Sequence, residues 1–275
     1  PIFLINLGFL VFIKVPSDCI ISGSRLTFLS HEHVYPDHSV HHSPSFCFFY
    51  FPDRNTHYNC NGVGNRNHVA EGEVRMYILP EEFLQLMSPR LLLRPLEEED
   101  VDLVVKLVTD PEMMEYAGGP ATSERIRTEM KSFTQRGADG SIGVWCICNA
   151  ETQESIGTIA LLPLPVEVKD TEWELVRSGE IPEREIEIGY FLRKDEWGQG
   201  FASEAISRIL EFAFSNSCLE EIVAVIDPKN RASQNVLERA GFSNEGDRSA
   251  YKKTSLGFRV TKLDWLKRSQ ENKKI

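Results

Sequence analysis

Apolar residues between positions 90 and 263 follow two spacings, and these spacings predict a mixture of strands and helices. Short apolar runs bounded by turn-forming residues predict strands at 90–96, 141–148, 155–162, 186–193 and 219–226. One or two closing strands are expected in the last segment, which contains Tyr251, Phe258, Val260 and Leu263. Apolar residues three or four apart predict helices at 97–108, 122–135, 200–215 and between Asn230 and Gly241.

The ends of the predicted helices carry suitable residues. Thr122 or Ser123 is placed to cap the second helix, Asn230 is placed to cap the fourth, and Gly241 is typical of a helix C-terminus. The resulting order is β-α-α-β-β-β-α-β-α-β(-β). Because a helix joins strands in the middle of this order, we expect at least one parallel pair there and an α/β (α+β) fold.

The first part of the chain has a different composition. Residues 1–70 contain four bases, four acids and all seven histidines, so the acidic excess of the chain lies after residue 70. Turn-formers and aromatics alternate there without a sustained period, and the apolar run 1–13 is too short to span a bilayer. We therefore expect residues 1–86 to be upstream sequence or a poorly ordered extension and 87–275 to be one domain. A membrane-proximal or regulatory arm is the alternative for residues 1–86.

Charge and cysteine usage narrow the class of protein. The net charge of -11 argues against a nucleic-acid partner and fits either simple solubility or a preference for cationic substrates. The six cysteines include no CxxC, and their spacing matches no zinc site, so we expect no metal and a reducing, cytoplasmic location away from membranes. Cys146 and Cys148 alternate along a predicted strand and are expected to point to opposite faces.

The strand Ile186–Arg193 is followed by Trp197-Gly198-Gln199-Gly200-Phe201-Ala202, which opens the third helix. A helix N-terminus has unpaired backbone N–H groups and partial positive charge, so this turn is suited to a pyrophosphate. A tight strand-to-helix turn with no ligand is the alternative.

Absent residues limit the possible chemistry. Residues 87–275 contain no histidine, which excludes Ser-His-Asp and Cys-His nucleophiles and argues against catalytic zinc. No GxxxxGK[ST] occurs, and the glycine pair lacks the third glycine of a dinucleotide site.

Three blocks resemble one family. Asn230–Phe242 and Trp197–Ala205 resemble two conserved blocks of GNAT-type N-acetyltransferases, and Arg90–Pro95 is similar to the opening strand of their ribosomal-protein N-terminal (Rim-type) subfamily. The resemblance covers roughly residues 88–245. It implies a mixed sheet of about six to seven strands, about four helices and splayed central parallel strands, with acetyl-CoA as co-substrate.

The resemblance also implies which residues contact acetyl-CoA. The motif strand would pair with the pantetheine arm, the glycine turn would hold the pyrophosphate, and the start of the fourth helix would hydrogen-bond the arm. Helix capping alone is the alternative for the last group. The implied cofactor-binding residues are Ile188, Phe191, Leu192, Trp197, Gly198, Gln199, Gly200, Phe201, Ala202, Asn230 and Ser233.

Acyl transfer to an amine needs a base, and the motif strand offers Glu187, with Glu185 sharing its face. The alternative for either residue is a charge at the edge of the strand that is solvated and has no catalytic role. The family's frequent acid, a Tyr in the last helix, is replaced here by Leu237, so Ser233, Tyr190 or simple departure of the thiolate must serve.

The expected acceptor is a primary amine of a peptide N-terminus or a small molecule, attacking directly in a ternary complex. The acidic segment 164–184 either lines the acceptor side or is a solvated loop, and Trp173 within it suggests a lid or an interface contact. A monomer or homodimer is expected. A catalytically silent acyl-CoA-binding sensor is the alternative function, since the frequent Tyr is missing.

Overall fold

The computed structural model describes residues 5–6, 9–10, 21–22, 25–26 and 81–272. The chain divides into two units, Pro1–Thr56 and His57–Ile275. In the first unit, β1 (Ile5–Asn6) pairs with β2 (Phe9–Leu10), and β3 (Ile21–Ser22) pairs with β4 (Arg25–Leu26). All histidines and Cys19, Cys47 and Cys60 lie outside the described residues, so the expectations for them stay predictions.

The second unit is built on one open sheet of eight strands in the order β11-β12-β10-β9-β8-β7-β6-β5. Neighbouring strands are antiparallel except β9 and β10, which are parallel. The strands are β5 (Leu86–Met87), β6 (Leu91–Pro95), β7 (Gly143–Asn149), β8 (Ser155–Pro163), β9 (Ile186–Leu192), β10 (Glu221–Ile226), β11 (Ser243–Ala250) and β12 (Lys253–Thr261).

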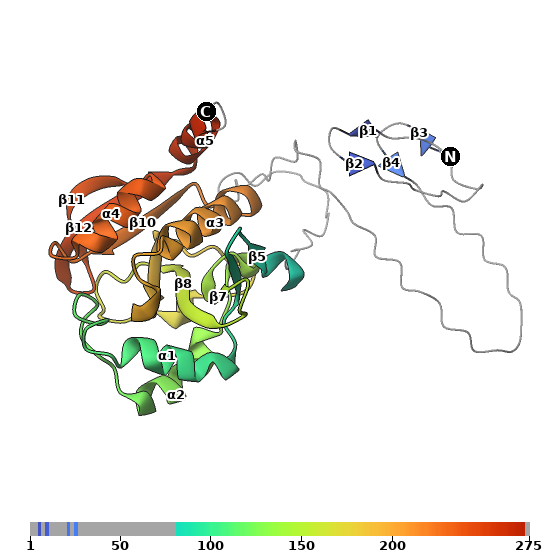
Figure 1. The fold of residues 1–275 in the computed structure, drawn as a ribbon. Coiled ribbons are helices and arrows are strands. Elements are labelled where there is room, and N and C mark those ends of the chain that lie inside the picture. The colour runs from blue at the N-terminus through green and yellow to red at the C-terminus, as the bar shows by residue number, and fades with distance from the viewer. Residues whose placement is uncertain (1–4, 7–8, 11–20, 23–24, 27–80, 273–275) are drawn as a thin grey trace, which may run out of the picture. The chain divides into compact units, whose positions relative to one another are not determined.

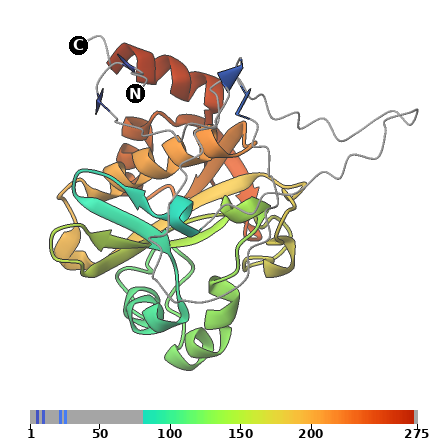
Figure 2. The same cartoon turned by 90° about the vertical axis from the view of Figure 1, so that its right-hand side faces the viewer.

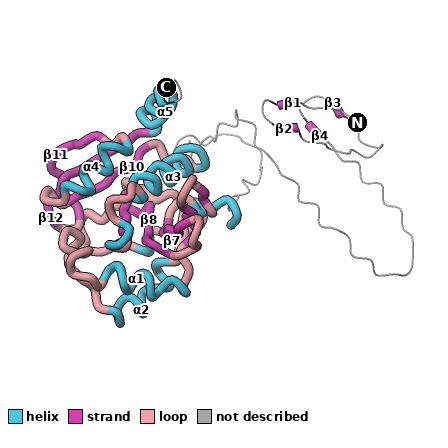
Figure 3. Tube along the Cα trace, in the orientation of Figure 1, coloured by secondary structure: helices cyan, strands magenta, loops and turns pink. Residues whose placement is uncertain are grey.

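Helices cover both faces of this sheet (Figures 1 and 2). The α-helices are α1 (Val101–Val108), α2 (Ser123–Phe133), α3 (Phe201–Asn216), α4 (Arg231–Ala240) and α5 (Lys262–Asn272). Helices α3 and α4 contribute to the main buried cluster on one face, whereas α1 and α2 pack in a separate cluster on the other. Figure 3 shows the two groups on opposite sides of the sheet. Within the described ranges, no helix is both long and apolar enough to cross a bilayer.

The expected fold class and element order are confirmed, as is the parallel central pair. The Thr122 hydroxyl accepts a hydrogen bond from the Arg125 N–H (3.3 Å), the Asn230 side chain accepts one from the Ser233 N–H (3.0 Å), and Gly241 ends α4 with a φ of +100°. The described unit has more elements than expected, with eight strands and five α-helices. The short strand β5 and the helix α5 account for part of this difference.

The position of Leu263 corrects one expectation. It lies in α5 and is 61% exposed, rather than in a closing strand. The start of α5 carries a signal that the apolar spacing does not show: the Asp264 N–H donates to the Thr261 hydroxyl at 3.1 Å, and that hydroxyl donates to the Asp264 carboxylate at 2.7 Å. A Thr three residues before an acid is an N-terminal capping pattern, and it ends β12 at Thr261.

Cys146 and Cys148 do not point to opposite faces, because residues two apart on a strand share a face. Both are buried in the cluster formed with α1 and α2, and their Sγ atoms lie 3.8 Å apart. They are free thiols in the structure.

Packing in the second unit extends upstream of the expected boundary at residue 87. Leu86 pairs with Leu93 across β5 and β6 and is 1% exposed, whereas its neighbour Met87 is 59% exposed. Leu84 is also buried in the main core cluster. The domain boundary itself stays a prediction.

Leu86→Ala is expected to lower the free energy of unfolding by about 2–5 kcal/mol, because it removes buried methyl groups and leaves a cavity. Met87→Ala is the matched control on the same two-residue strand, with an expected change below about 0.5 kcal/mol. Urea unfolding followed by circular dichroism measures both. Equal changes would contradict the assignment of Leu86 to the core.

Candidate active site

The central parallel pair separates almost as soon as it forms. β8 and β9 pair from Gly157–Leu192 to Pro163–Ile186, and β10 pairs with β12 along its whole length. By contrast, β9 and β10 share one register pair, Glu187 with Val223. Beyond it, the β10-facing edge of Ile188–Leu192 has no strand partner among the residues that the structure describes. That edge presents backbone donors and acceptors to an extended ligand, in the manner of an added strand.

Two helix N-termini follow the open ends of these strands. Gly198 and Gly200 have φ values of +76° and +83°, and Gly200 is the residue from which α3 begins. A Cβ at Gly198 would meet nothing within 4 Å, so the turn is bare backbone beside open space. This is the geometry that the glycine motif predicted, and its N–H groups are suited to a phosphate.

Trp197 fixes the glycine turn to the end of β9. Its indole N–H donates to the Leu192 carbonyl at 2.8 Å, while the side chain stays 48% exposed. Ile188 and Leu192 are buried on the core face, so their backbone is the part that faces the opening. Phe191 lies on the other face and is half-buried.

Arg90, the residue before β6, contacts the same turn, and the sequence reasoning did not include it in the site. Its guanidinium donates to the Gln199 carbonyl at 3.0 Å and lies 4.6 Å from the centre of the Phe201 ring. It also pairs with Glu204 at 2.7 Å, which neutralises a carboxylate in the first turn of α3. Since a negative charge there competes with a bound phosphate, Arg90 keeps the helix N-terminus available for an anion.

The start of α4 faces β9. Asn230 caps α4 as described above, and its contact with the cofactor stays a prediction. The Tyr190 hydroxyl lies near Ser233, and it is buried with no well-formed hydrogen bond among the described residues. Burial raises the pKa of Tyr190, opposed by Ser233. Leu237 is fully buried, so α4 supplies no polar group at that position.

Glu187 lies at the point where β9 and β10 part. Its side chain is on the opposite face of β9 from Tyr190 and is buried, with 9% exposure. Burial raises the pKa of Glu187 to about 7, opposed by hydrogen bonds from the Tyr251 hydroxyl and the Val225 backbone and by the charges of Arg248 and Lys253. Two residues along the same face, a Cβ on Gly189 would meet nothing within 4 Å. This face of β9 therefore has open space beside it two residues from Glu187.

Tyr251 is the second residue that the sequence did not reveal as part of the site. It belongs to the turn between β11 and β12, and its hydroxyl donates to the Glu187 carboxylate at 2.5 Å across 64 positions of sequence. A lone Tyr in a hairpin turn carries no recognisable signal, because the contact exists only after four strands are assembled.

Glu185 is engaged elsewhere. Its carboxylate accepts hydrogen bonds from Arg248 at 3.2 Å and Arg259 at 2.8 Å. Two guanidinium groups occupy this carboxylate, which favours Glu187 over Glu185 as a proton acceptor.

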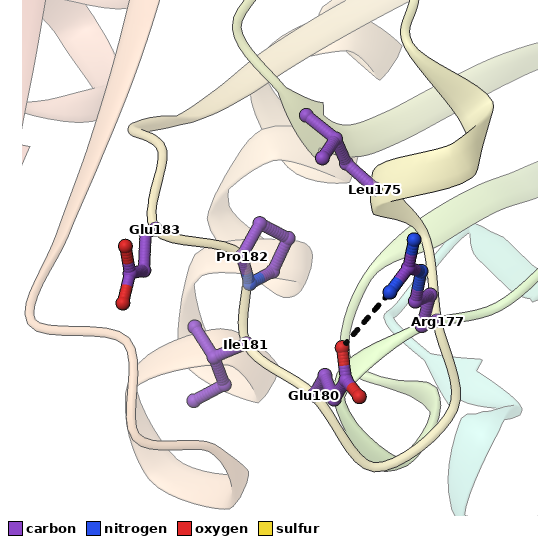
Figure 4. A pocket seen from close by; sticks show the side chains of 6 residues that line it. All are labelled: Leu175, Arg177, Glu180, Ile181, Pro182 and Glu183. Atoms are coloured by element: carbon purple, nitrogen blue, oxygen red, sulfur yellow. Dashed lines mark ion pairs between the residues drawn. The ribbon is translucent and has the colours of Figure 1, made fainter.

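The acidic segment 164–184 is anchored to α2. Asp170 pairs with Arg125 at 3.2 Å, and the Trp173 ring lies 5.4 Å from the Phe133 ring. Trp173 therefore makes an internal contact with a helix. A surface hollow of about 440 Å³ lies in this segment and is lined by residues of one stretch, between Leu175 and Glu183 (Figure 4). It includes none of the predicted site residues.

A second hollow of about 330 Å³ does reach the glycine turn. Its lining includes Gln199 and Phe201 together with Arg90 and the β7–β8 turn at Asn149–Glu151. Among the described residues, no group of three or more His, Cys, Asp or Glu side chains is placed to hold a metal ion.

Glu187→Gln is expected to change how stability depends on pH. Since the folded-state pKa is raised from 4.5 to about 7, the native carboxyl keeps its proton while the unfolded one ionises, and the wild type loses stability as pH rises through that interval. The variant lacks this loss. Relative to wild type, its free energy of unfolding should be similar at pH 4 and rise by up to about 3 kcal/mol by pH 8. Urea titrations at several pH values measure this difference, and a constant offset would contradict the raised pKa.

Comparison with known proteins agrees with this geometry. Residues 90–243 match the acetyltransferase (GNAT) domain family. The chain is 30% identical over 170 residues to the uncharacterized N-acetyltransferase p20 of Bacillus licheniformis, covering 61% of this chain and 87% of that protein.

Solved structures share the fold. The acetyltransferase from Agrobacterium tumefaciens str. C58 superposes with a TM-score of 0.52 at 24% identity, covering 72% of this chain and 99% of that one. An aminoglycoside acetyltransferase, AAC(6')-Ib, in complex with coenzyme A gives a TM-score of 0.51 at 16% identity, covering 64% and 97%. The predicted enzyme class, an N-acetyltransferase, is confirmed. Over more than half of its length, this chain belongs to the GNAT acetyltransferase family.

Proposed function

We propose that the protein transfers the acetyl group of acetyl-CoA to a primary amine, by direct attack in a ternary complex. The observation that carries the proposal is the parting of β9 and β10 at Glu187, with two helix N-termini beyond the opening and a buried carboxyl at its apex. A donor held along the strand edge and an acceptor reaching Glu187 would meet at this point.

The residues present fit a CoA co-substrate. The free edge of Ile188–Leu192 would pair with the pantetheine amides, and the N–H groups of Gln199 to Ala202 would hold the pyrophosphate. Trp197, Gly198, Gly200 and Phe201 shape that turn. Ser233 and the unpaired Tyr190 hydroxyl supply polar contacts on the α4 side, where an orphaned buried hydroxyl calls for a partner.

Glu187 is proposed as the general base. Acetyl-CoA supplies an activated acyl group with a thiolate leaving group. The Glu187 carboxylate accepts the proton that the amine loses, and a pKa near 7 leaves a substantial ionised fraction at neutral pH. Backbone N–H groups of β9 are suited to polarise the acyl carbonyl.

Tyr190 or Ser233 is proposed as the proton donor to the leaving sulfur. Both lie on the α4 side of β9, opposite Glu187, so acid and base would approach the reacting atoms from different faces. Leu237 has no proton to donate at its own position. The alternative is that the thiolate departs without protonation by a protein side chain.

A peptide N-terminus or a small-molecule amine is the proposed acceptor. Trp197 and the Arg90–Pro95 strand support a Rim-type preference for peptide amines. Asp170 acts electrostatically on Tyr251, so the acidic segment adjoins the acceptor side of Glu187 and would favour a cationic amine. A cytoplasmic monomer or homodimer, with its catalytic domain at residues 87–275, completes the proposal.

Thiol release from acetyl-CoA should depend on the acceptor when the full chain is assayed with a diamine, a polyamine, an aminoglycoside and short peptides with free N-termini. Glu187→Gln should lower kcat by about 10²–10⁴-fold, because general-base assistance is lost, and should remove the acidic limb of the rate–pH profile. Binding of acetyl-CoA without turnover on any of these amines would instead support a silent acyl-CoA sensor.

Gly200→Ala is expected to weaken CoA binding about tenfold or more, because a Cβ would stand where the pyrophosphate approaches the backbone. Gly246→Ala is the matched control, because its φ of +82° lies within a degree of the φ of Gly200. A Cβ at Gly246 would meet nothing within 4 Å, and a Cβ at Gly200 would meet only the Arg90 guanidinium, at 3.5 Å. Both variants carry the same backbone strain. Calorimetric titration with CoA should separate them, and equal weakening would argue against a pyrophosphate site at the turn.

A further inference from the structure

We propose that Tyr251 is a positioning residue for the base, a role in which its hydroxyl holds the Glu187 carboxylate at the apex of the strand opening. The inference rests on the proposed function, since it concerns how Glu187 is held for proton transfer. Tyr251 donates to Glu187 Oε2 at 2.5 Å and so fixes the orientation of the carboxylate. Tyr251 acts through Glu187 rather than on the substrate.

The hairpin turn that carries Tyr251 is held in an unfavourable backbone conformation. Tyr251 and Lys252 have φ values of +52° and +57°, which side chains other than Gly, Asn and Asp rarely adopt. Glycine would relieve this strain but would remove the hydroxyl. Strained residues persist where the surrounding structure fixes them, and they gather at functional sites.

Backbone contacts fix the turn from the other side. The Tyr251 N–H donates to the Pro165 carbonyl at 2.9 Å, and the Lys252 N–H donates to the Val166 carbonyl at 3.3 Å. Below the turn, Ala250 is buried with Leu164 and Val223, the strand neighbour of Glu187. The segment after β8 therefore docks the turn so that the ring of Tyr251 packs over this cluster and its hydroxyl reaches the carboxyl group.

Other charged groups face Glu187 but do not replace this contact. Arg248 of β11 and Lys253 of β12 act on it through their charge, and Val225 of β10 supplies a backbone hydrogen bond. Arg248 is itself bound to Glu185 at 3.2 Å and to Glu245 at 3.0 Å. Burial and the neighbouring Glu187 raise the pKa of Tyr251, and the charge of Asp170 adds to this effect, so the hydroxyl stays a donor.

Tyr251→Phe removes the hydroxyl and keeps the ring that packs against Leu164, Val223 and Ala250. In this variant the Glu187 carboxylate would remain buried but would lose the hydrogen bond that the Tyr251 hydroxyl donates to it. Because hydrogen bonds to the charged form favour ionisation, the carboxyl should then ionise at higher pH.

The test is a pH titration of the full-length protein labelled with ¹³C at the glutamate carboxyl, with no ligand present. The resonance missing from Glu187→Gln identifies Glu187. We expect its midpoint to rise by about one pH unit in Tyr251→Phe, from the loss of one charge-assisted hydrogen bond. Tyr116→Phe, which removes a tyrosine hydroxyl in the α1–α2 connection, is the control and should leave the midpoint in place. An unchanged midpoint in Tyr251→Phe would overturn the inference.

Turnover with the best acceptor of the amine panel supplies a second measurement. The acidic limb of the rate–pH profile should move upward in Tyr251→Phe, while KM for acetyl-CoA stays within about twofold. In the Glu187→Gln background, Tyr251→Phe should cause no further loss, because the two residues act as one unit. A full additional loss in that background would contradict a role through Glu187.

The base role of Glu187 and the positioning role of Tyr251 can be refuted separately. A wild-type rate–pH profile in Glu187→Gln would remove the base assigned above, whereas the NMR midpoint would still report the contact of Tyr251 with the carboxyl. If Tyr251→Phe does not fold, the wild type labelled with ¹³C at the tyrosine ring Cζ tests the contact instead. One tyrosine resonance should shift with the Glu187 midpoint and lose that shift in Glu187→Gln, because the Tyr251 hydroxyl donates to the carboxylate. The absence of any such tyrosine resonance would overturn the inference.

Discussion

One register pair, Glu187 with Val223, joins the two halves of the sheet. On one side of this contact β5 to β9 form an antiparallel array, and on the other β10, β12 and β11 form a second one. Continued pairing between β9 and β10 would satisfy their backbone groups and close the opening. Because the pairing stops, unpaired edges, two helix N-termini and a buried carboxyl converge on one place.

Burial of the Glu187 carboxyl group at this contact lowers the stability of the folded protein. Removing an ionisable group from water disfavours its charged form, and a raised pKa is the result. The structure offsets part of this penalty with the Tyr251 hydroxyl and the Val225 backbone, supported by Arg248 and Lys253. The remaining shift leaves Glu187 close to neutrality, where a base has both a usable ionised fraction and sufficient proton affinity. The stability lost in this way accompanies the role of general base proposed for Glu187.

At the other end of the opening, the N-terminus of α3 carries partial positive charge and has a carboxylate beside it. The N-terminus of α3 is favourable for an anion, yet Glu204 lies in its first turn. Ser88 and Arg90 bind that carboxylate at 2.8 Å and 2.7 Å, so the segment between β5 and β6 offsets the charge at the start of α3. The same arginine holds the Gln199 carbonyl and thereby orients the peptide groups that would face a phosphate.

Local patterns in the sequence determined most of the architecture. Apolar spacing, the caps at Thr122 and Asn230 and the terminal Gly241 depend on neighbours within four residues, so they can be read directly, and the glycine turn is of the same kind. Glu187 was a candidate because its strand was recognisable. Leu263 was misplaced because its helix begins with a capping pair rather than with apolar periodicity.

The contacts that give these residues their chemistry were decided only by the tertiary structure. Tyr251 meets Glu187 across 64 positions, Arg90 meets Gln199 across 109, and Glu185 is withdrawn by arginines from two other strands. Such contacts, and the burial that shifts the pKa of Glu187, depend on strand order and register, which no local pattern encodes. The sequence by itself determined which backbone elements form and where a phosphate could bind, whereas assembly of the sheet decided which carboxylate is buried and what holds it.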